Sequence, residues 1–258
     1  MSRLVQSAGG RLPRGWRDLL RQGALFFVAY NLYQVVRGVA DGRHAVAIAN
    51  GLHVMHLERS LGAFFEPSFQ QAFLAHQWVI ELANWMYFNS HFAITTAFLV
   101  WLYLFRNDSF NFVRNMFLVA MCFALVGYLL FPTAPPRMFP GAGFTDTISV
   151  LGHTNHDSSF IGLLVNPYAA VPSMHIAFAL MVSVPAMNLV RSAWARALWS
   201  TYPLVVFFVI VVTANHFWFD AAAGAAVACM AAVTAHQLAR LRPDTWSWRD
   251  DAIDEAPA

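Results

Sequence analysis

The stretch VVTANHFWFDAAAGAAVA, residues 211–228, is an apolar run that contains Asn215, His216 and Asp220. Ionisable residues inside membrane segments are costly, and by default they indicate function. His216 and Asp220 are four residues apart, so one helical turn can bring the carboxylate beside the imidazole. A carboxylate on one ring nitrogen fixes the tautomer and makes the other nitrogen a better nucleophile or base. The pair predicts a catalytic histidine, and a structural ion pair is the alternative.

Two other polar clusters interrupt apolar sequence, in AAVPSMHIAF and in FPTAPPRMFP. In the first, Pro172 suits the first turn of a helix, and Ser173 offers a hydroxyl beside free backbone N–H groups that bind anions. In the second, the planar guanidinium of Arg137 suits phosphate, and an interfacial anchor is the alternative. Asn215 either hydrogen-bonds phosphate or caps the following helix. With His175, these residues indicate phosphoryl transfer, in which one histidine attacks phosphorus and the other protonates the leaving oxygen.

The composition is that of an integral membrane protein. Hydrophobic residues make up 58% of the 258 residues and charged residues 12%, with a mean hydropathy of +0.49, whereas soluble domains carry about 25% charged residues. All 16 basic residues are arginine, which excludes chemistry that needs a lysine. The net charge of +2 and the lack of an arginine-rich stripe argue against nucleic acid as a partner. No feature of the sequence indicates an oligomeric state.

A spanning helix needs about 20 mostly apolar residues. Six runs meet this requirement, near residues 23–39, 78–105, 112–131, 175–190, 198–213 and 219–238. The segment between the first two, residues 45–77, is too broken by polar residues to cross a membrane. It fits two short amphipathic helices on the membrane surface, separated near Glu66 and Pro67. The expected fold class is therefore an all-α integral membrane protein with six transmembrane helices and short interfacial helices between the first two.

The arginines predict the orientation. With the N-terminus in the cytoplasm, 12 of the 16 arginines fall in cytoplasmic segments and 4 in outer segments, which favours both termini inside the cell. This multi-pass topology in the plasma membrane places all three polar clusters at one depth on the outer face. The expected division is a cytoplasmic segment 1–22, a six-span catalytic membrane domain 23–240 and a polar cytoplasmic tail 241–258.

The sequences PSMH and, about forty residues later, NHFWFD resemble the motifs P-S-G-H and S-R-x5-H-x3-D of the type 2 phosphatidic acid phosphatase superfamily. The resemblance implies that His216 forms a phosphohistidine, Asp220 orients it and His175 is the general acid. It also implies that Ser173 and Arg137 hold the phosphate of a membrane lipid. It implies neither a metal nor an organic cofactor.

Two departures bear on the reaction. The lysine of the family's first motif would fall at Leu130, and the arginine of its third motif at Ile210. The forms TAPPR and ANHFWFD look like the branch that contains fungal inositol phosphorylceramide synthase, as do LERSLGAFFE and NWMYFNSH upstream. Those upstream stretches contain Glu58, Glu66, Tyr87 and His91. This branch implies transfer of a phosphate-linked headgroup to an alcohol or lipid acceptor, and a lipid phosphate phosphatase is the alternative.

Other polar residues leave alternatives open. Tyr87 and His91 can line a substrate path, and a core histidine with satisfied hydrogen bonds is the alternative. The stretch GHTNHD, residues 152–157, has loose metal-ligand spacing but reads more simply as a solvated loop. A membrane metal or haem protein would use His91, His175, His216 and His236 as ligands. The depth expected for His236, near the cytoplasmic end of the last span, argues against that site. A non-catalytic binding relative is a further alternative, against which the complete His–His–Asp set argues.

Overall fold

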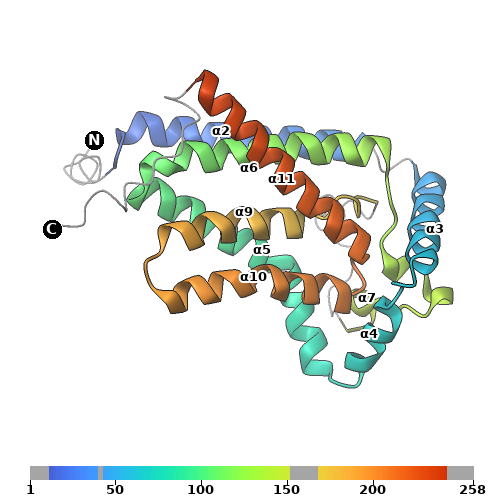
Figure 1. Cartoon of the computed structure of the whole chain (residues 1–258). Helices are drawn as coiled ribbons and strands as arrows, with labels where there is room; N and C mark the ends of the chain where they lie inside the picture. Colours follow the sequence, from blue (N-terminus) through green and yellow to red (C-terminus); the bar gives the residue numbers. More distant parts are fainter. Residues whose placement is uncertain (1–11, 40–42, 152–167, 243–258) are drawn as a thin grey trace.

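The structure is a computed structural model that describes residues 12–39, 43–151 and 168–242, and those parts are almost entirely helical (Figure 1). No β-strand forms in these parts beyond one isolated bridge between Thr133 and Ala169. The all-α prediction is therefore confirmed. The helices are α2 (Gly15–Val39), α3 (His44–Ser60), α4 (Glu66–Leu74), α5 (Gln77–Phe105), α6 (Asn107–Leu130), α7 (Thr147–Leu151), α9 (Met174–Leu189), α10 (Ala193–Val212) and α11 (Trp218–Leu241), with 3-10 turns η1 (Pro136–Met138) and η2 (Pro140–Ala142).

Four helices in the described residues, α5, α6, α10 and α11, are long and apolar enough to cross a membrane, which indicates a multi-pass membrane protein. The other two predicted spans do not meet both conditions. Helix α9 is apolar but has only 16 residues. Helix α2 has 25 residues, but Asn31, Gln34 and Arg37 lower the hydropathy of its second half.

Helix α9 is the centre of the bundle, because α5, α6, α10 and α11 all pack against it. Small side chains allow helices to approach closely where no water drives their association. The fully buried small residues at these contacts are Ala120 and Ala124 on α6, Ala177, Ala179 and Ala186 on α9, and Ala231 and Ala235 on α11. At Gly224 the approach is at backbone level, since an added Cβ would lie 2.2 Å from the carbonyl oxygen of Ser173.

The segment 45–77 folds into two helices, α3 and α4, with Glu66 and Pro67 in the first turn of α4 as the sequence predicts. With α7 they gather at one end of the bundle, whereas the start of α2 and the end of α11 lie toward the opposite end (Figure 1). The segment is tied to the bundle by buried polar contacts. The amide of Gln70 donates to the carbonyls of Thr145 (2.9 Å) and Val212 (3.2 Å).

Two helix starts differ from the expectation. Helix α2 begins at Gly15, so it includes the second half of the expected N-terminal segment. Helix α9 begins at Met174 with Ser173 as its N-cap, so Pro172 precedes the helix and is not in its first turn. The ring of Pro172 instead packs on α6, because a Cβ added at Gly127 would lie 2.7 Å from its Cδ.

Candidate active site

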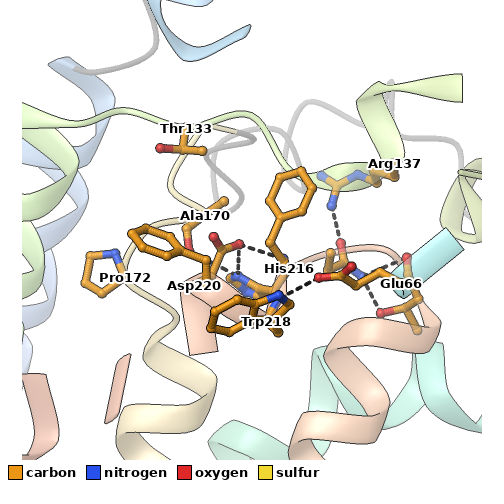
Figure 2. A network of polar contacts seen from close by, with 12 residues as sticks. Glu66, Thr133, Arg137, Ala170, Pro172, His216, Trp218 and Asp220 are labelled. Atoms are coloured by element: carbon orange, nitrogen blue, oxygen red, sulfur yellow. Dashed lines mark hydrogen bonds and ion pairs between the residues drawn. The ribbon is translucent and has the colours of Figure 1, made fainter. Parts of the chain in front are cut away.

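His216 lies in the short connection between α10 and α11 and is 4% exposed. Its Nδ1 is 3.0 Å from the carbonyl oxygen of Ala170 and 3.2 Å from Oδ2 of Asp220 (Figure 2). A carbonyl oxygen only accepts hydrogen bonds, so the proton of the neutral ring is on Nδ1. Nε2 then carries the free lone pair, which is the form that a nucleophilic histidine needs.

Asp220 reaches His216 by a different route from the one the sequence predicts. His216 is not in the helix, because α11 begins at Trp218 and Phe217 is its N-cap. Asp220 is the third helical residue, and its Oδ2 accepts the backbone N–H of Phe217 at 2.9 Å as well as contacting His216. This is one half of a capping box. The predicted pair is present, and the start of the helix, not a shared helical turn, holds it together.

Burial lowers the pKa of His216 to about 3, and the nearby guanidinium of Arg137 acts in the same direction. The hydrogen bond to the carbonyl of Ala170 opposes these effects and is weaker than burial. A histidine with a lowered pKa is neutral at pH 7, because it binds a proton only below that pKa. The ring therefore needs no deprotonation before it can attack an electrophile.

His175, in the first turn of α9, faces His216 with 5.6 Å between the ring centroids and 61° between the ring planes. Two α5 residues hold it. The ring of Tyr87 stacks on His175 at 4.3 Å, and the His91 ring lies 4.6 Å away. The Nε2 of His175 is 3.3 Å from the carbonyl of Tyr87, to which it donates. The structure thus brings Tyr87 and His91 beside the two histidines. The contact between His91 and His175 is a packing contact between their rings.

Ser173 links the two helices that carry the histidine pair. Its backbone N–H donates to the carbonyl of Asp220 at 3.0 Å, and its side chain is fully buried. Its hydroxyl has no hydrogen-bond partner within the described residues. A buried hydroxyl without a partner costs free energy unless a ligand supplies one.

Arg137 and Asn215 contact each other. The guanidinium donates through Nη1 to Oδ1 of Asn215, and the backbone N–H of Arg137 donates to the carbonyl of Ala214 at 2.8 Å (Figure 2). Asn215 in turn donates to Oγ1 of Thr213 at 2.8 Å. The capping alternative for Asn215 is wrong, because Phe217 is the N-cap of α11. Arg137 is half-buried and hydrogen-bonds to Asn215, the residue before His216. This is not the position of a side chain that extends to lipid headgroups.

The family model of the PAP2 superfamily matches residues 52–234, a range that contains every residue described above. The chain belongs to the PAP2 superfamily. Its members are phosphatases and phosphotransferases that act on lipid phosphates, so this chain is a membrane enzyme of that class. No curated protein and no solved structure matches the chain.

This PAP2 chain also has a pair of buried carboxyl groups that residue types alone did not single out. Glu58 and Glu66 are both 0% exposed. Oε1 of Glu66 accepts the N–H of Trp218 at 3.0 Å, and Oε1 of Glu58 accepts the N–H of Phe219 at 3.1 Å. These carboxyl groups thus bind the free N–H groups at the start of α11 and fix α3 and α4 beside His216. The only sequence signal was the stretch LERSLGAFFE.

Burial, and then the charge of Glu66, raise the pKa of Glu58 to about 9. A carboxyl group with a raised pKa keeps its proton up to that pH, so Glu58 is neutral at pH 7. The pair therefore adds less negative charge to the site than two ionised carboxylates would. This limits the repulsion that an anionic substrate meets at the start of α11.

Leu130 and Ile210, which stand where the family motifs have a lysine and an arginine, bring no positive charge to the site. Leu130 ends α6 and is 76% exposed, and Ile210 is fully buried inside α10. Arg137 is the cation that contacts the site within the described residues. The PAP2 chain therefore has fewer positive groups at these positions than the superfamily motifs contain.

Of the four histidines of the metal-binding alternative, His91, His175 and His216 lie together and His236 does not. His236 lines a separate pocket with Asn188 and Arg240. The stretch 152–157 lies outside the described residues. In the described parts of the chain, no group of three or more His, Cys, Asp or Glu residues has the geometry to hold a metal ion.

Proposed function

We propose that this enzyme transfers a phosphate-containing group from a membrane lipid to an alcohol acceptor through a phosphohistidine at His216. The observation that carries the proposal is the arrangement of the two histidines. His216 presents a free Nε2 lone pair, and the ring of His175 faces it at 5.6 Å. Two such groups on either side of a phosphoryl group can act as nucleophile and as proton donor.

In the first step Nε2 of His216 attacks phosphorus, and the bond from phosphorus to the leaving oxygen breaks. Positive charge then develops on the imidazole, and Asp220 and the carbonyl of Ala170 stabilise it through Nδ1–H. The leaving oxygen takes a proton from His175, which the buried ring binds together with the anionic substrate. Its Nε2–H is directed at the carbonyl of Tyr87, so Nδ1 is the nitrogen that serves this role.

In the second step His175 takes the proton of the acceptor hydroxyl, the acceptor oxygen attacks phosphorus, and the bond from His216 to phosphorus breaks. The phosphate oxygens are held by Arg137, Asn215 and the hydroxyl of Ser173. Arg137 supplies the charge, and Ser173 has a buried oxygen without a partner within the described residues. No step requires a metal ion.

The charge of the site favours a phosphodiester over a phosphomonoester. A headgroup phosphodiester carries one negative charge, whereas a phosphomonoester carries up to two at pH 7. Arg137 is the cation that contacts the site within the described residues. One cation offsets a single negative charge better than two, so a diester-linked substrate is favoured over a lipid monophosphate.

We expect purified enzyme to form a new phosphodiester from a labelled phospholipid donor and an alcohol, in proportion to acceptor concentration. Polyols and long-chain alcohols form the acceptor panel, and chromatography of the labelled products measures transfer against release. A product ratio that rises with acceptor supports transfer. If every donor and acceptor pair yields only hydrolysed product at a rate independent of acceptor, the enzyme is a lipid phosphate phosphatase.

We propose that both termini are cytoplasmic and that the active site faces the outside of the plasma membrane, in accordance with the arginine distribution. In a variant without Cys122 and Cys229, Gly141→Cys should react with an impermeant thiol reagent in intact cells. Gly141 lies at the end of the bundle that carries the site, and a Cβ there meets no atom within 4 Å. Asp108→Cys, in the first turn of α6, should react only in permeabilised cells. Labelling in the opposite order would show the reverse orientation.

A further inference from the structure

A long apolar groove leads away from the two histidines. Its volume is about 1010 Å³, and its walls come from α2, α5, α6 and α9. His175, His216 and Tyr87 line one end. The walls beyond them are almost entirely apolar and aromatic, with Phe26, Phe92 and Phe117 among the lining residues. A lipid whose phosphate sits at His216 would therefore have an apolar path for its tail.

The groove is long relative to a lipid leaflet. On α5 it is lined by residues from Tyr87 to Leu104, which recur at intervals of about four residues and form one stripe along the helix. At 1.5 Å per residue this stripe is roughly 25 Å long. The hydrocarbon core of a bilayer is about 30 Å thick, so one leaflet accounts for roughly 15 Å. The groove thus continues past the middle of the membrane.

Polar side chains lie at the far end of the groove, where Gln22 and Tyr103 line it. Tyr103 on α5 donates to Asp18 on α2 at 3.1 Å, and Gln22 donates to Asp18 at 3.1 Å. Arg114 on α6 donates to Gln22 at 2.7 Å. These contacts join α2 to α5 and α6 below the groove.

We propose that this groove binds the tail of the substrate lipid and selects a tail long enough to pass the bilayer centre. The inference rests on the proposed function, because it assigns the lipid whose phosphate group reacts at His216. Polyprenyl chains and very long alkyl chains share this length. An ordinary phospholipid, with tails confined to one leaflet, leaves the far half of the groove without its own contacts.

Gly23 on α2 is the residue that tests the length dependence most directly. It lines the groove near the polar end, beside Gln22. A Cβ added there meets no atom within 4 Å, so a side chain enters open space without forcing the backbone to move. A large residue at this position would occupy space near the polar end of the groove and leave the half next to the histidines open.

We expect Gly23→Trp to lower the ratio of kcat/KM for long-tail over short-tail substrates by about tenfold. The long substrates are headgroup phosphodiesters of decaprenol and of a very long saturated alcohol, and the short one is the farnesyl analogue. The two long substrates distinguish a polyprenyl tail from an alkyl tail. Val28→Trp is the matched control, because Val28 is on the same helix, is 62% exposed and does not line the groove. An unchanged ratio in Gly23→Trp would overturn the proposal.

A second measurement does not depend on turnover. His216→Ala protein in nanodiscs is incubated with a headgroup phosphodiester of decaprenol that has a photoreactive group at the tail end, and the crosslinked peptides are identified by mass spectrometry. We expect crosslinks near Tyr103 and Phe110, and their loss in the double variant with Gly23→Trp. Crosslinks confined to the half near Phe88 would contradict the proposal. So would equal labelling of the far end by a tail-labelled ordinary phospholipid.

These two measurements separate the inference from the proposed function. If tail-end crosslinks form near Tyr103 and no lipid phosphate is turned over, the groove stands and the catalytic assignment fails. If lipids are turned over without any dependence on tail length, the reaction stands and the tail site fails.

Discussion

Replacing His216 by alanine is expected to lower turnover of the lipid substrate by on the order of 10⁴-fold or more, because removal of a nucleophile eliminates the covalent route. The protein should still fold. The His216 side chain makes its hydrogen bonds to Asp220 and to the carbonyl of Ala170, and Asp220 keeps its bond to the N–H of Phe217 without it. Expression and elution of a single species in size-exclusion chromatography check this. His56→Ala is the matched control, because His56 is exposed on α3 and far in sequence from the site.

A labelled substrate distinguishes the nucleophile from a residue that only positions it. Wild-type enzyme quenched during turnover should retain an acid-labile, base-stable label on His216, as expected of a bond from nitrogen to phosphorus, and His216→Ala should retain none. His175→Ala should accumulate the label when the leaving group is p-nitrophenol, since that group departs without a proton but the second step still needs a base. A label that persists in His216→Ala would assign the nucleophile to another residue.

Replacing Gly224 by alanine is expected to destabilise the protein and inactivate it, although alanine is usually favoured over glycine inside a helix. Alanine in place of glycine favours a helix by about 1 kcal/mol. At Gly224, however, the new Cβ would lie 2.2 Å from the backbone oxygen of Ser173, which has no rotamer to escape. Overpacking of this kind costs about 1–3 kcal/mol, and a shift of 1 Å in a catalytic group can cost about 10²-fold in rate. The contact joins Ser173 to α11, the helix that also carries Asp220. A shift there would therefore lower both stability and activity.

Thermal unfolding in detergent measures the first effect and kcat the second. Gly23→Ala is the control for stability, since it makes the same substitution in another helix where the Cβ meets no atom within 4 Å. We expect Gly23→Ala to keep or raise Tm and Gly224→Ala to lower it. Equal Tm values for the two variants would show that α11 moves away from α9 at little cost.

The sequence by itself determined the class of protein and predicted which residues react. The apolar runs predicted the helices within a few residues for α5 and α9, because burial in lipid requires an uninterrupted apolar helix. His175, His216 and Asp220 stand out in such runs, since ionisable side chains are rarely kept there without a function. Glu66 and Pro67 likewise mark the start of α4, because proline is favoured in the first turn of a helix.

The sequence did not determine how those groups are held. The contact of Asp220 with His216 depends on the backbone turn at residues 213–217, and no periodicity describes a turn. Glu58 and Glu66 come from helices more than 150 residues before α11, and their role follows only from where its N–H groups lie. The same holds for Gly224, whose neighbours are alanines of nearly the same character.

The tertiary structure alone decided three features: the tautomer of His216, the carboxyl pair at the start of α11 and the groove between α2 and α5. Each depends on the packing of segments distant in sequence, because a carbonyl from residue 170 or a wall from α2 reaches the site only when the bundle closes. Residue type and spacing encode what a side chain can do. The distances to its partners are set by how closely the helices pack, and small residues such as Gly224 set that distance at the centre of this enzyme.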